Sequence, residues 1–322
     1  MKNFNRLLIL LFACLVFTLG ACAPTKYKKP VENFNSTTTG SKHIYFDQLK
    51  SSHESFTDRY EMKLKLDMLS DDEYDYEGQF YKKDKERILG MTKSTSIPKA
   101  SLEIRARAFK ILEYYGKTLK TLASDEKTES LKIELTGLSK DSAKFLKTVE
   151  GLSDLNESFS FLESISDWAG PIGNAVTVIN KVVEIVSDYF REKALKEAII
   201  TAHPMVDDLI GLLKKEAVTA AEMRKNNYFQ MDRECRGTLT KIKKMDAASK
   251  YLIHNICNDI EVVQVKLIDP DELEKAFALV IDSHSEMKKM AEGGPFDEMQ
   301  GKVREFQQKL EVIKTKFELV ID

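Results

Sequence analysis

The sequence contains few of the residues that interrupt helices and few of those that bind metals. Its 322 residues include seven prolines, fourteen glycines, five histidines and four cysteines. The scarcity of proline and glycine favours long uninterrupted helices, because both residues weaken or break a helix interior. No H-x3-H, HExxH, GxSxG, P-loop or GxGxxG pattern occurs in the chain. We therefore expect no catalytic residues, no metal and no cofactor, and we expect that the protein is not an enzyme.

Neither sign of charge dominates the chain. Lysine and arginine number 49 against 51 aspartates and glutamates, and the net charge is −2. Proteins that bind nucleic acid usually carry a clear basic excess, so we expect no nucleic-acid partner. Hydrophobic residues make up 43% and charged residues 31%, which is typical of a globular or bundled protein with its own core.

The first 21 residues have the layout of a secretory signal peptide. Lys2 and Arg6 precede an uninterrupted run of eleven apolar residues, from Leu7 to Phe17. This length suits the apolar region of a signal peptide, whereas a helix that crosses a bilayer needs about 20 apolar residues. We therefore expect cleavage rather than a permanent membrane span.

Leu19-Gly20-Ala21-Cys22 resembles the lipobox of bacterial lipoproteins, with its two middle residues in swapped order. The resemblance implies transfer of diacylglycerol to the Cys22 thiol, cleavage before Cys22, and acylation of the new amino group by a fatty acid such as palmitate. Several acyl chains on one residue anchor a protein stably, while a single chain is marginal. The alternative is ordinary cleavage after Ala23, which would leave Pro24 at the new terminus, a bond that signal peptidases cut poorly.

The resemblance also implies a location. In Gram-negative lipoproteins an aspartate after the lipidated cysteine marks retention in the inner membrane. Ala23 occupies that position here. We therefore expect a lipid anchor in the outer membrane, with the protein facing the periplasm.

The remaining chain divides into a short polar segment and a long helical one. Residues 22–41 have no apolar periodicity and are rich in Pro, Gly, Ser, Thr and Asn, so they are expected to form a flexible tether. Residues 42–322 are expected to form an all-α, elongated bundle of about six to eight helices, some of them very long. The helices are predicted from His43, over 99–122, 124–151, 168–200, 204–269 and 270–292, and from Pro295 onward. The segment 204–269 is expected to be either one helix or two with a kink near Gly237.

The segment Trp168 to Ile200 is the most apolar part of the chain after the signal, and two interpretations compete for it. It could form a buried central helix, or it could act on a membrane through residues 168–190, as helical pore-forming proteins do. Lys181 and Glu184 interrupt it and are costly in hydrocarbon, which favours the buried helix. The same helix face would pack in the core on the first interpretation and insert into the membrane on the second. Its residues are Val176, Ile179, Val183, Val186 and Phe190.

Two cysteines remain after the signal and the anchor are set aside. Cys235 and Cys257 either form a disulfide or stay as free thiols. On one continuous helix their separation of 22 residues would place them about 33 Å apart, so a bridge requires a turn between them. Cys257 also shares a predicted helix face with His254, and a soft metal could use both, although a packing role is the simpler interpretation.

The sequence therefore predicts a lipid-anchored helical protein of the cell envelope that binds or scaffolds another envelope protein. Its layout resembles predicted bacterial lipoproteins of unknown function, so the resemblance implies no activity. The membrane-active protein is the alternative. A hydrolase or metal enzyme is the least favoured hypothesis, and it would use His254, or His203 with Asp207 and Asp208.

Overall fold

The computed structural model describes residues 25–70, 99–124, 128–150, 165–188, 191–241, 246–265, 267, 269–294 and 308. These residues form seven α-helices and one short 3-10 helix, and no strand occurs among them, which confirms the predicted all-α bundle. The elements are η1 (Thr25–Tyr27), α2 (Lys28–Ser70), α4 (Lys99–Ala123), α5 (Thr128–Glu150), α6 (Ile165–Asp188), α7 (Arg191–Leu239), α8 (Ala247–Val265) and α9 (Pro270–Ala291).

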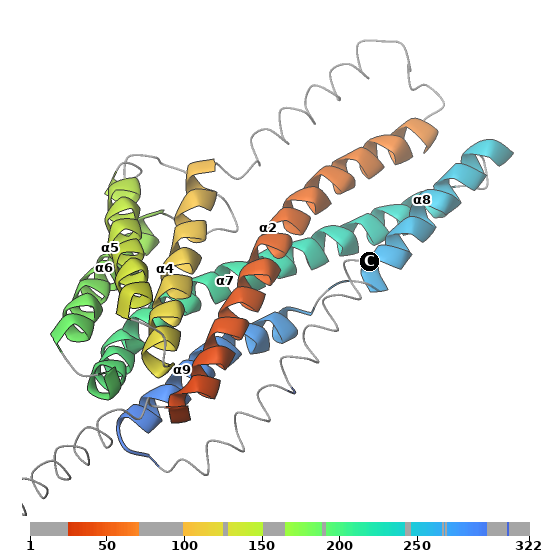
Figure 1. Cartoon of the computed structure of the whole chain (residues 1–322). Helices are drawn as coiled ribbons and strands as arrows, with labels where there is room; N and C mark the ends of the chain where they lie inside the picture. Colours follow the sequence, from red (N-terminus) through yellow and green to blue (C-terminus); the bar gives the residue numbers. More distant parts are fainter. Residues whose placement is uncertain are drawn as a thin grey trace, which may run out of the picture.

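Helix α7 is the centre of the bundle (Figure 1). It has 49 residues, which corresponds to about 74 Å of helix. Helices α2, α4, α6, α8 and α9 all contact it, while α5 packs on α4 and α6. The bundle is therefore elongated along α7, with α4, α5 and α6 covering one half of its length and α8 lying against the other (Figure 1).

Polar pairs between helices show which way the helices run relative to one another. Lys26 lies 3.4 Å from Glu192, and Arg59 lies 3.2 Å from Glu234, so α2 and α7 run parallel. Helix α9 runs the opposite way along α7, because Lys214 pairs with Glu274 early in α9 and His203 pairs with His284 further along it. The start of α2, the start of α7 and the end of α9 therefore lie at one end of the bundle, and we call this the anchor end.

The helix boundaries that depend on strong local signals agree with the predictions. Helix α9 begins at Pro270 after an N-cap at Asp269, whose side chain accepts a hydrogen bond from the Asp271 amide. It is followed by Gly293 with a φ of +97°, a conformation that glycine adopts most readily. The predicted helices over 99–122 and 124–151 correspond to α4 and α5. The helix predicted from Pro295 lies outside the described residues, apart from position 308.

The long predicted helix over 204–269 is two helices that reverse direction. Helix α7 ends at Leu239, two residues after Gly237, and α8 begins at Ala247. Asp246 caps α8, since its carboxylate accepts hydrogen bonds from the Ala248 and Ser249 amides at 2.8 and 2.9 Å. The prediction of two helices is therefore confirmed, although the chain folds back at the break rather than kinking.

The predicted flexible tether over residues 22–41 is wrong for most of its length. Helix α2 already begins at Lys28, and the side chains of Val31 and Phe34 are completely buried. The polar residues that suggested a linker are part of the packed face. Thr37, for example, is buried, and its hydroxyl donates to the carbonyls of Asn33 and Phe34 at 2.9 Å. Residues 22–24 lie outside the described part of the chain.

A close contact between α2 and α4 depends on glycine. The Asn35 side chain donates a hydrogen bond to the Gly116 carbonyl at 3.1 Å. A Cβ at position 116 would lie 1.7 Å from the Asn35 Oδ1, so any other residue there would displace Asn35. Gly116 therefore sets how closely these two helices approach.

Helix α6 packs into the bundle, as the preferred interpretation of the apolar segment expects. Ile179 is completely buried and Val186 nearly so, whereas Val176 and Val183 are only partly buried. The buried stripe is therefore rotated slightly from the predicted face, and its members are Trp168, Ile172, Ala175, Ile179, Val182 and Val186. Phe190 lies outside the described residues. Among the helices that are described, none pairs enough length with enough apolarity to span a bilayer.

Two predictions for residues 168–200 are wrong, namely where the helix starts and that the whole segment forms one helix. Helix α6 starts at Ile165, three residues before the predicted segment, and includes Pro171 in its interior, where proline has no N–H to donate to the Asp167 carbonyl. The apolar stretch to Ile200 is shared by α6 and α7, with α7 starting at Arg191.

Candidate functional site

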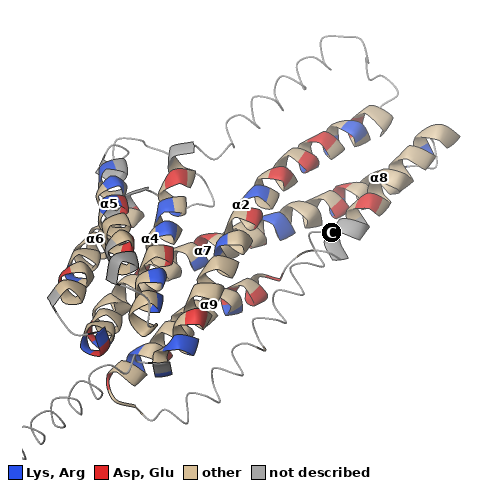
Figure 2. Ribbon diagram, in the orientation of Figure 1, with Lys and Arg blue, Asp and Glu red and all other residues tan. Residues whose placement is uncertain are grey.

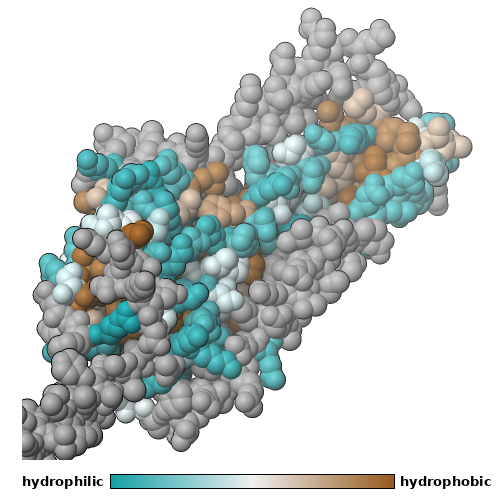
Figure 3. Space-filling view, in the orientation of Figure 1, coloured by the Kyte–Doolittle hydropathy of each residue, from teal (hydrophilic) through white to brown (hydrophobic). Residues whose placement is uncertain are grey.

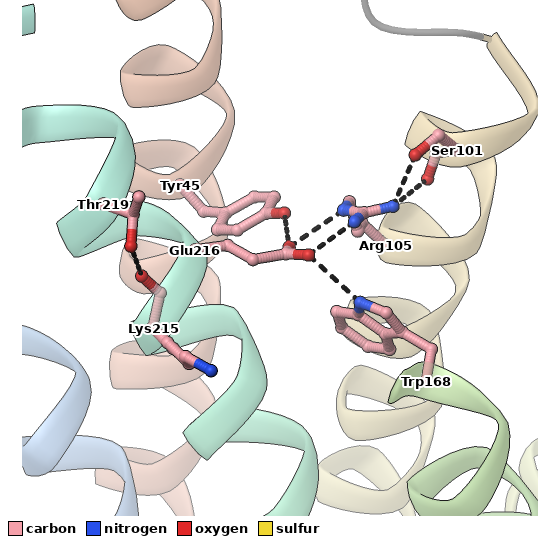
Figure 4. Close-up of polar contacts among 7 residues, drawn as sticks. All are labelled: Tyr45, Ser101, Arg105, Trp168, Lys215, Glu216 and Thr219. Carbon is pink, nitrogen blue, oxygen red and sulfur yellow. Dashed lines mark hydrogen bonds and ion pairs between the residues drawn. The ribbon is translucent and has the colours of Figure 1, made fainter. Parts of the chain in front are cut away.

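A buried ion pair lies where α2, α4, α6 and α7 meet (Figure 4). Both Arg105 and Glu216 have completely buried side chains. The Arg105 guanidinium donates from Nε to Glu216 Oε2 at 2.8 Å and from a second nitrogen, Nη2, to Oε1. Tyr45 donates its hydroxyl to Oε2 at 2.5 Å, and Trp168 donates its indole N–H to Oε1 at 3.1 Å.

The other side of the guanidinium is also occupied. Nη1 of Arg105 donates to the Ser101 carbonyl at 2.9 Å and to the Ser101 hydroxyl at 2.6 Å. Burial works against the charge of Arg105, but Tyr45 and Glu216 outweigh it and raise the pKa of the guanidinium. Burial also raises the pKa of the Tyr45 hydroxyl, and the Glu216 carboxylate raises it further. The phenol thus stays a hydrogen-bond donor.

This network holds helices together and offers little to a ligand. Glu216 accepts four hydrogen bonds, which is about the full capacity of a carboxylate. The donors belong to three residues, Tyr45 on α2, Arg105 on α4 and Trp168 on α6. A buried charge that is fully paired in this way fixes the relative positions of the elements that contribute to it. We therefore assign the Arg105–Glu216 pair a structural role.

Two histidines form a second polar cluster near the anchor end. His284 is completely buried, with its Nε2 2.8 Å from the Tyr115 hydroxyl and its Nδ1 3.1 Å from Nδ1 of His203. The two imidazole rings are stacked, with centroids 5.3 Å apart. Burial, together with the neighbouring His203 and Lys288, lowers the pKa of His284 to about 3. Burial also lowers the pKa of His203, so both rings are neutral at pH 7.

The predicted pairing of His203 with an aspartate does not form. Asp207 and Asp208 are both exposed, and the His203 ring bonds to His284 instead. Among the described residues the His203 ring thus hydrogen-bonds to a histidine rather than to a carboxylate, although the charge of Asp207 acts to raise the pKa of His203.

We expect the protein to lose stability as the pH falls below about 6.5. An unfolded histidine binds a proton near pH 6.5, whereas folded His284 does so only near pH 3. Between these values the unfolded chain binds more protons, so the free energy of unfolding decreases by about 1.4 kcal/mol per pH unit, or about 2 kcal/mol by pH 5. Urea unfolding at pH 7 and pH 5 measures this loss.

The comparison variant for this prediction is His284→Gln, which cannot titrate. Its loss of stability between pH 7 and pH 5 should be smaller than that of the wild type by about 2 kcal/mol. His254→Gln is the control, because His254 is exposed and should leave the pH dependence unchanged. Equal pH dependence in the wild type and His284→Gln would refute the role of His284.

Cys235 and Cys257 form a disulfide between α7 and α8, with their Cα atoms 5.7 Å apart. The reversal of the chain between the two helices makes this bridge possible, which resolves the alternative that the sequence left open. Neither sulfur is available as a thiolate, so the metal site that would use Cys257 with His254 is wrong. Within the described residues, no three His, Cys, Asp or Glu side chains are placed to hold a metal ion.

A cleft of about 220 Å³ opens between α2, α7 and α8, at the end of the bundle opposite the anchor end. We call it the distal cleft. Figure 3 shows apolar surface gathered over this end of α2 and α8, bordered by hydrophilic surface. Its apolar lining is Met62, Met231, Ile256 and Ile260, and its polar lining is Asp58, Glu61, Lys65, Tyr228 and Asp259.

The distal cleft is negatively charged. Three carboxylates and one ammonium group line it, and the Arg224 guanidinium lies over the Tyr228 ring beside it, so acidic groups still outnumber basic ones by three to two. This imbalance is local, because elsewhere Lys and Arg alternate with Asp and Glu along the helices (Figure 2). The Tyr228 hydroxyl donates to Asp58 at 3.2 Å, and partial burial raises the pKa of Asp58 although its side chain is largely exposed. Burial and the nearby Asp58 raise the pKa of Tyr228 to about 12.

The walls of the cleft are cross-linked. The Asn227 side chain donates to the Ser55 hydroxyl at 3.0 Å, which ties α2 to α7. The disulfide ties α7 to α8, and Cys235 belongs to the same apolar cluster as Met62, Met231 and Ile260. This site could not be predicted from the sequence, because its three walls come together only after the chain reverses between α7 and α8.

No protein-family model, no curated protein and no solved structure matches the chain.

Proposed function

We propose that the chain is a bacterial lipoprotein, anchored through an acylated Cys22, whose helical body is a binding module facing the periplasm from the outer membrane. The observation that carries the proposal is the lipobox-like Leu19-Gly20-Ala21-Cys22 at the end of a signal-like segment. The helical bundle that follows supplies a rigid body with one charged, partly apolar cleft.

The helical body starts very close to the proposed anchor. Tyr27 is completely buried and lies five residues after Cys22. A chain of that length spans at most about 17 Å, so an acylated Cys22 would hold the anchor end against the membrane surface. Lys28 and Lys29 are exposed at this end, where lipid phosphates would attract them. A linker this short supports a helical body held close to the membrane surface rather than one on a long flexible tether.

The position of the distal cleft supports a binding role. Asp58 lies 30 residues along α2 from Lys28, which corresponds to about 45 Å of helix. With the anchor end at the membrane, a bundle that stands upright would present the cleft to the periplasm, within reach of another envelope protein. The two buried polar clusters lie between these ends and are explained by helix packing, which supports a binding module over an enzyme.

Replacing Cys22 with alanine should abolish the anchor. Cys22→Ala removes the sulfur that receives the diacylglyceryl group, and cleavage and acylation of the amine follow that step, so we expect no incorporation of labelled palmitate and accumulation of uncleaved precursor. Cys14→Ala is the matched control, since Cys14 lies within the apolar region of the signal and outside the lipobox. Labelling and fractionation of membranes measure both effects. Normal labelling of Cys22→Ala would overturn the proposal.

A further inference from the structure

We propose that the distal cleft binds a basic, amphipathic helix of a partner protein, which inserts a long cationic side chain between α2 and α8. This inference deepens the proposed binding function by naming the class of partner. It depends on the distal cleft alone and on no property of the anchor.

The size of the cleft selects side chains rather than a free small molecule. At about 220 Å³ it is smaller than the ~300–1,000 Å³ of clefts that enclose drug-sized ligands. A volume of this size accommodates one or two side chains. The rest of the ligand would then lie along the surface beside the cleft.

The chemistry of the lining selects a long basic side chain. Lysine and arginine carry an apolar stem below a cationic head, and they bind best where both parts find partners. The stem would contact Met62 and Met231, whose flexible thioethers adapt to irregular shapes. The head would meet the carboxylates of Glu61 and Asp259 at the exposed rim. Lys65 on the same rim would repel a second cation, which favours a single inserted side chain.

The two outer walls are helix faces that continue beyond the cleft. On α2, Asp58, Met62 and Lys65 follow one another at helical spacing, so they share a face. On α8, Leu252 lies one turn before Ile256 on the same face, and its side chain is 47% exposed. An exposed apolar residue in line with the cleft extends the contact surface along α8. Two helices with α7 between them form the groove that an amphipathic helix fits.

The cleft is held open in advance. The disulfide fixes α8 on α7, and the Asn227–Ser55 hydrogen bond fixes α2 on α7. A site whose walls do not have to be ordered during binding loses less entropy and binds more tightly. This preorganisation is expected of a recognition site.

Methionine methyl groups report on the cleft directly. The mature chain as isolated from native membranes, acylated or not, would be labelled with 13C at the methionine methyls, held in zwitterionic nanodiscs and titrated with a short Leu/Ala/Arg amphipathic helix. We expect saturable shifts of the Met62 and Met231 signals, with none at Met287 and Met290, which are buried in α9. The same peptide with glutamate in place of arginine should leave all four signals unchanged, because the cleft carries negative charge.

Substitutions at the rim test the charge argument. Glu61→Gln with Asp259→Asn removes two exposed carboxylates, and we expect the Arg peptide to bind about five to ten times more weakly. Asp207→Asn with Asp208→Asn is the matched control, because it makes the same charge change on exposed α7 positions outside the cleft. Equal effects of the two double variants, equal shifts with the glutamate peptide, or no shift at Met62 and Met231 would overturn the proposal.

The readout separates this inference from the lipid anchor. A chain that lacks acyl groups but gives the expected methyl shifts would refute the anchor and retain the distal cleft. An acylated chain without the shifts would retain the anchor and refute the cleft.

Discussion

Replacing Glu216 with glutamine is expected to lower the free energy of unfolding by about 3–5 kcal/mol. Glutamine has the shape of glutamate but no charge, so the completely buried Arg105 would lose its counter-ion. Its amide nitrogen would also face donors where an oxygen now accepts hydrogen bonds from Trp168 and the guanidinium. A buried charge without a partner is among the most destabilising changes that a single substitution makes. Urea unfolding followed by circular dichroism measures the loss.

The matched control for this prediction lies on α4, the helix that carries Arg105. Glu103 forms an ion pair with Arg107, one turn away on α4, and its side chain is 47% exposed. Exposed pairs of this spacing contribute about 0.3–0.5 kcal/mol, so Glu103→Gln should have a small effect. If Glu216→Gln were no more destabilising than Glu103→Gln, the Arg105–Glu216 pair would not be what fixes the four helices.

Removing the disulfide is expected to cost about 3 kcal/mol. The bridge joins residues 22 positions apart, and closing a loop of that length restricts the unfolded chain by roughly this amount. Cys235→Ala with Cys257→Ala removes it without leaving a reactive thiol. The loss should be concentrated at α8, which contacts the bundle mainly through α7, so amide hydrogen exchange should accelerate there first.

Reduction of the wild-type protein gives an independent check of this prediction. A reductant should destabilise the wild type by a similar amount and should not affect the double alanine variant. Unchanged exchange in α8 after the bridge is removed would mean that packing alone holds this helix in place.

The helices that could be predicted are those whose signal is local. Helix α4 has a regular apolar stripe, with Phe109, Leu112 and Leu119 all buried. Helix α9 begins with an Asp-Pro pair and ends before two glycines, and each of these residues acts on its own backbone. Local chemistry of this kind needs no knowledge of the fold.

The part of helix α2 before His43 escaped prediction, because much of the packed face of this helix is polar. Thr38, Ser41, Ser52 and Ser55 are buried where an amphipathic pattern would have apolar residues. Small hydroxyl side chains can bond to carbonyls of their own helix, as Ser55 does to Ser52 at 2.7 Å. In sequence such a segment has the composition of a linker, and only its neighbours show that it is packed.

The polar sites depend on contacts between distant parts of the chain. Tyr45 and Glu216 are 171 positions apart, and Arg105 and Glu216 are 111 apart. In the sequence Glu216 is one of three consecutive charged residues of α7, after Lys214 and Lys215, and nothing there indicates its buried partners. The residues of the distal cleft become neighbours only because the chain reverses after Gly237, and the sequence did not establish that reversal.

The most direct test of the anchored binding module is the mass of the mature N-terminus, taken from native membranes. We expect residues 1–21 to be absent and the first residue to be Cys22, carrying a diacylglyceryl group on its sulfur and a fatty acid on its amine. A mature chain that begins at Pro24 without lipid, or one that retains Met1 and an unmodified Cys22, would contradict this expectation.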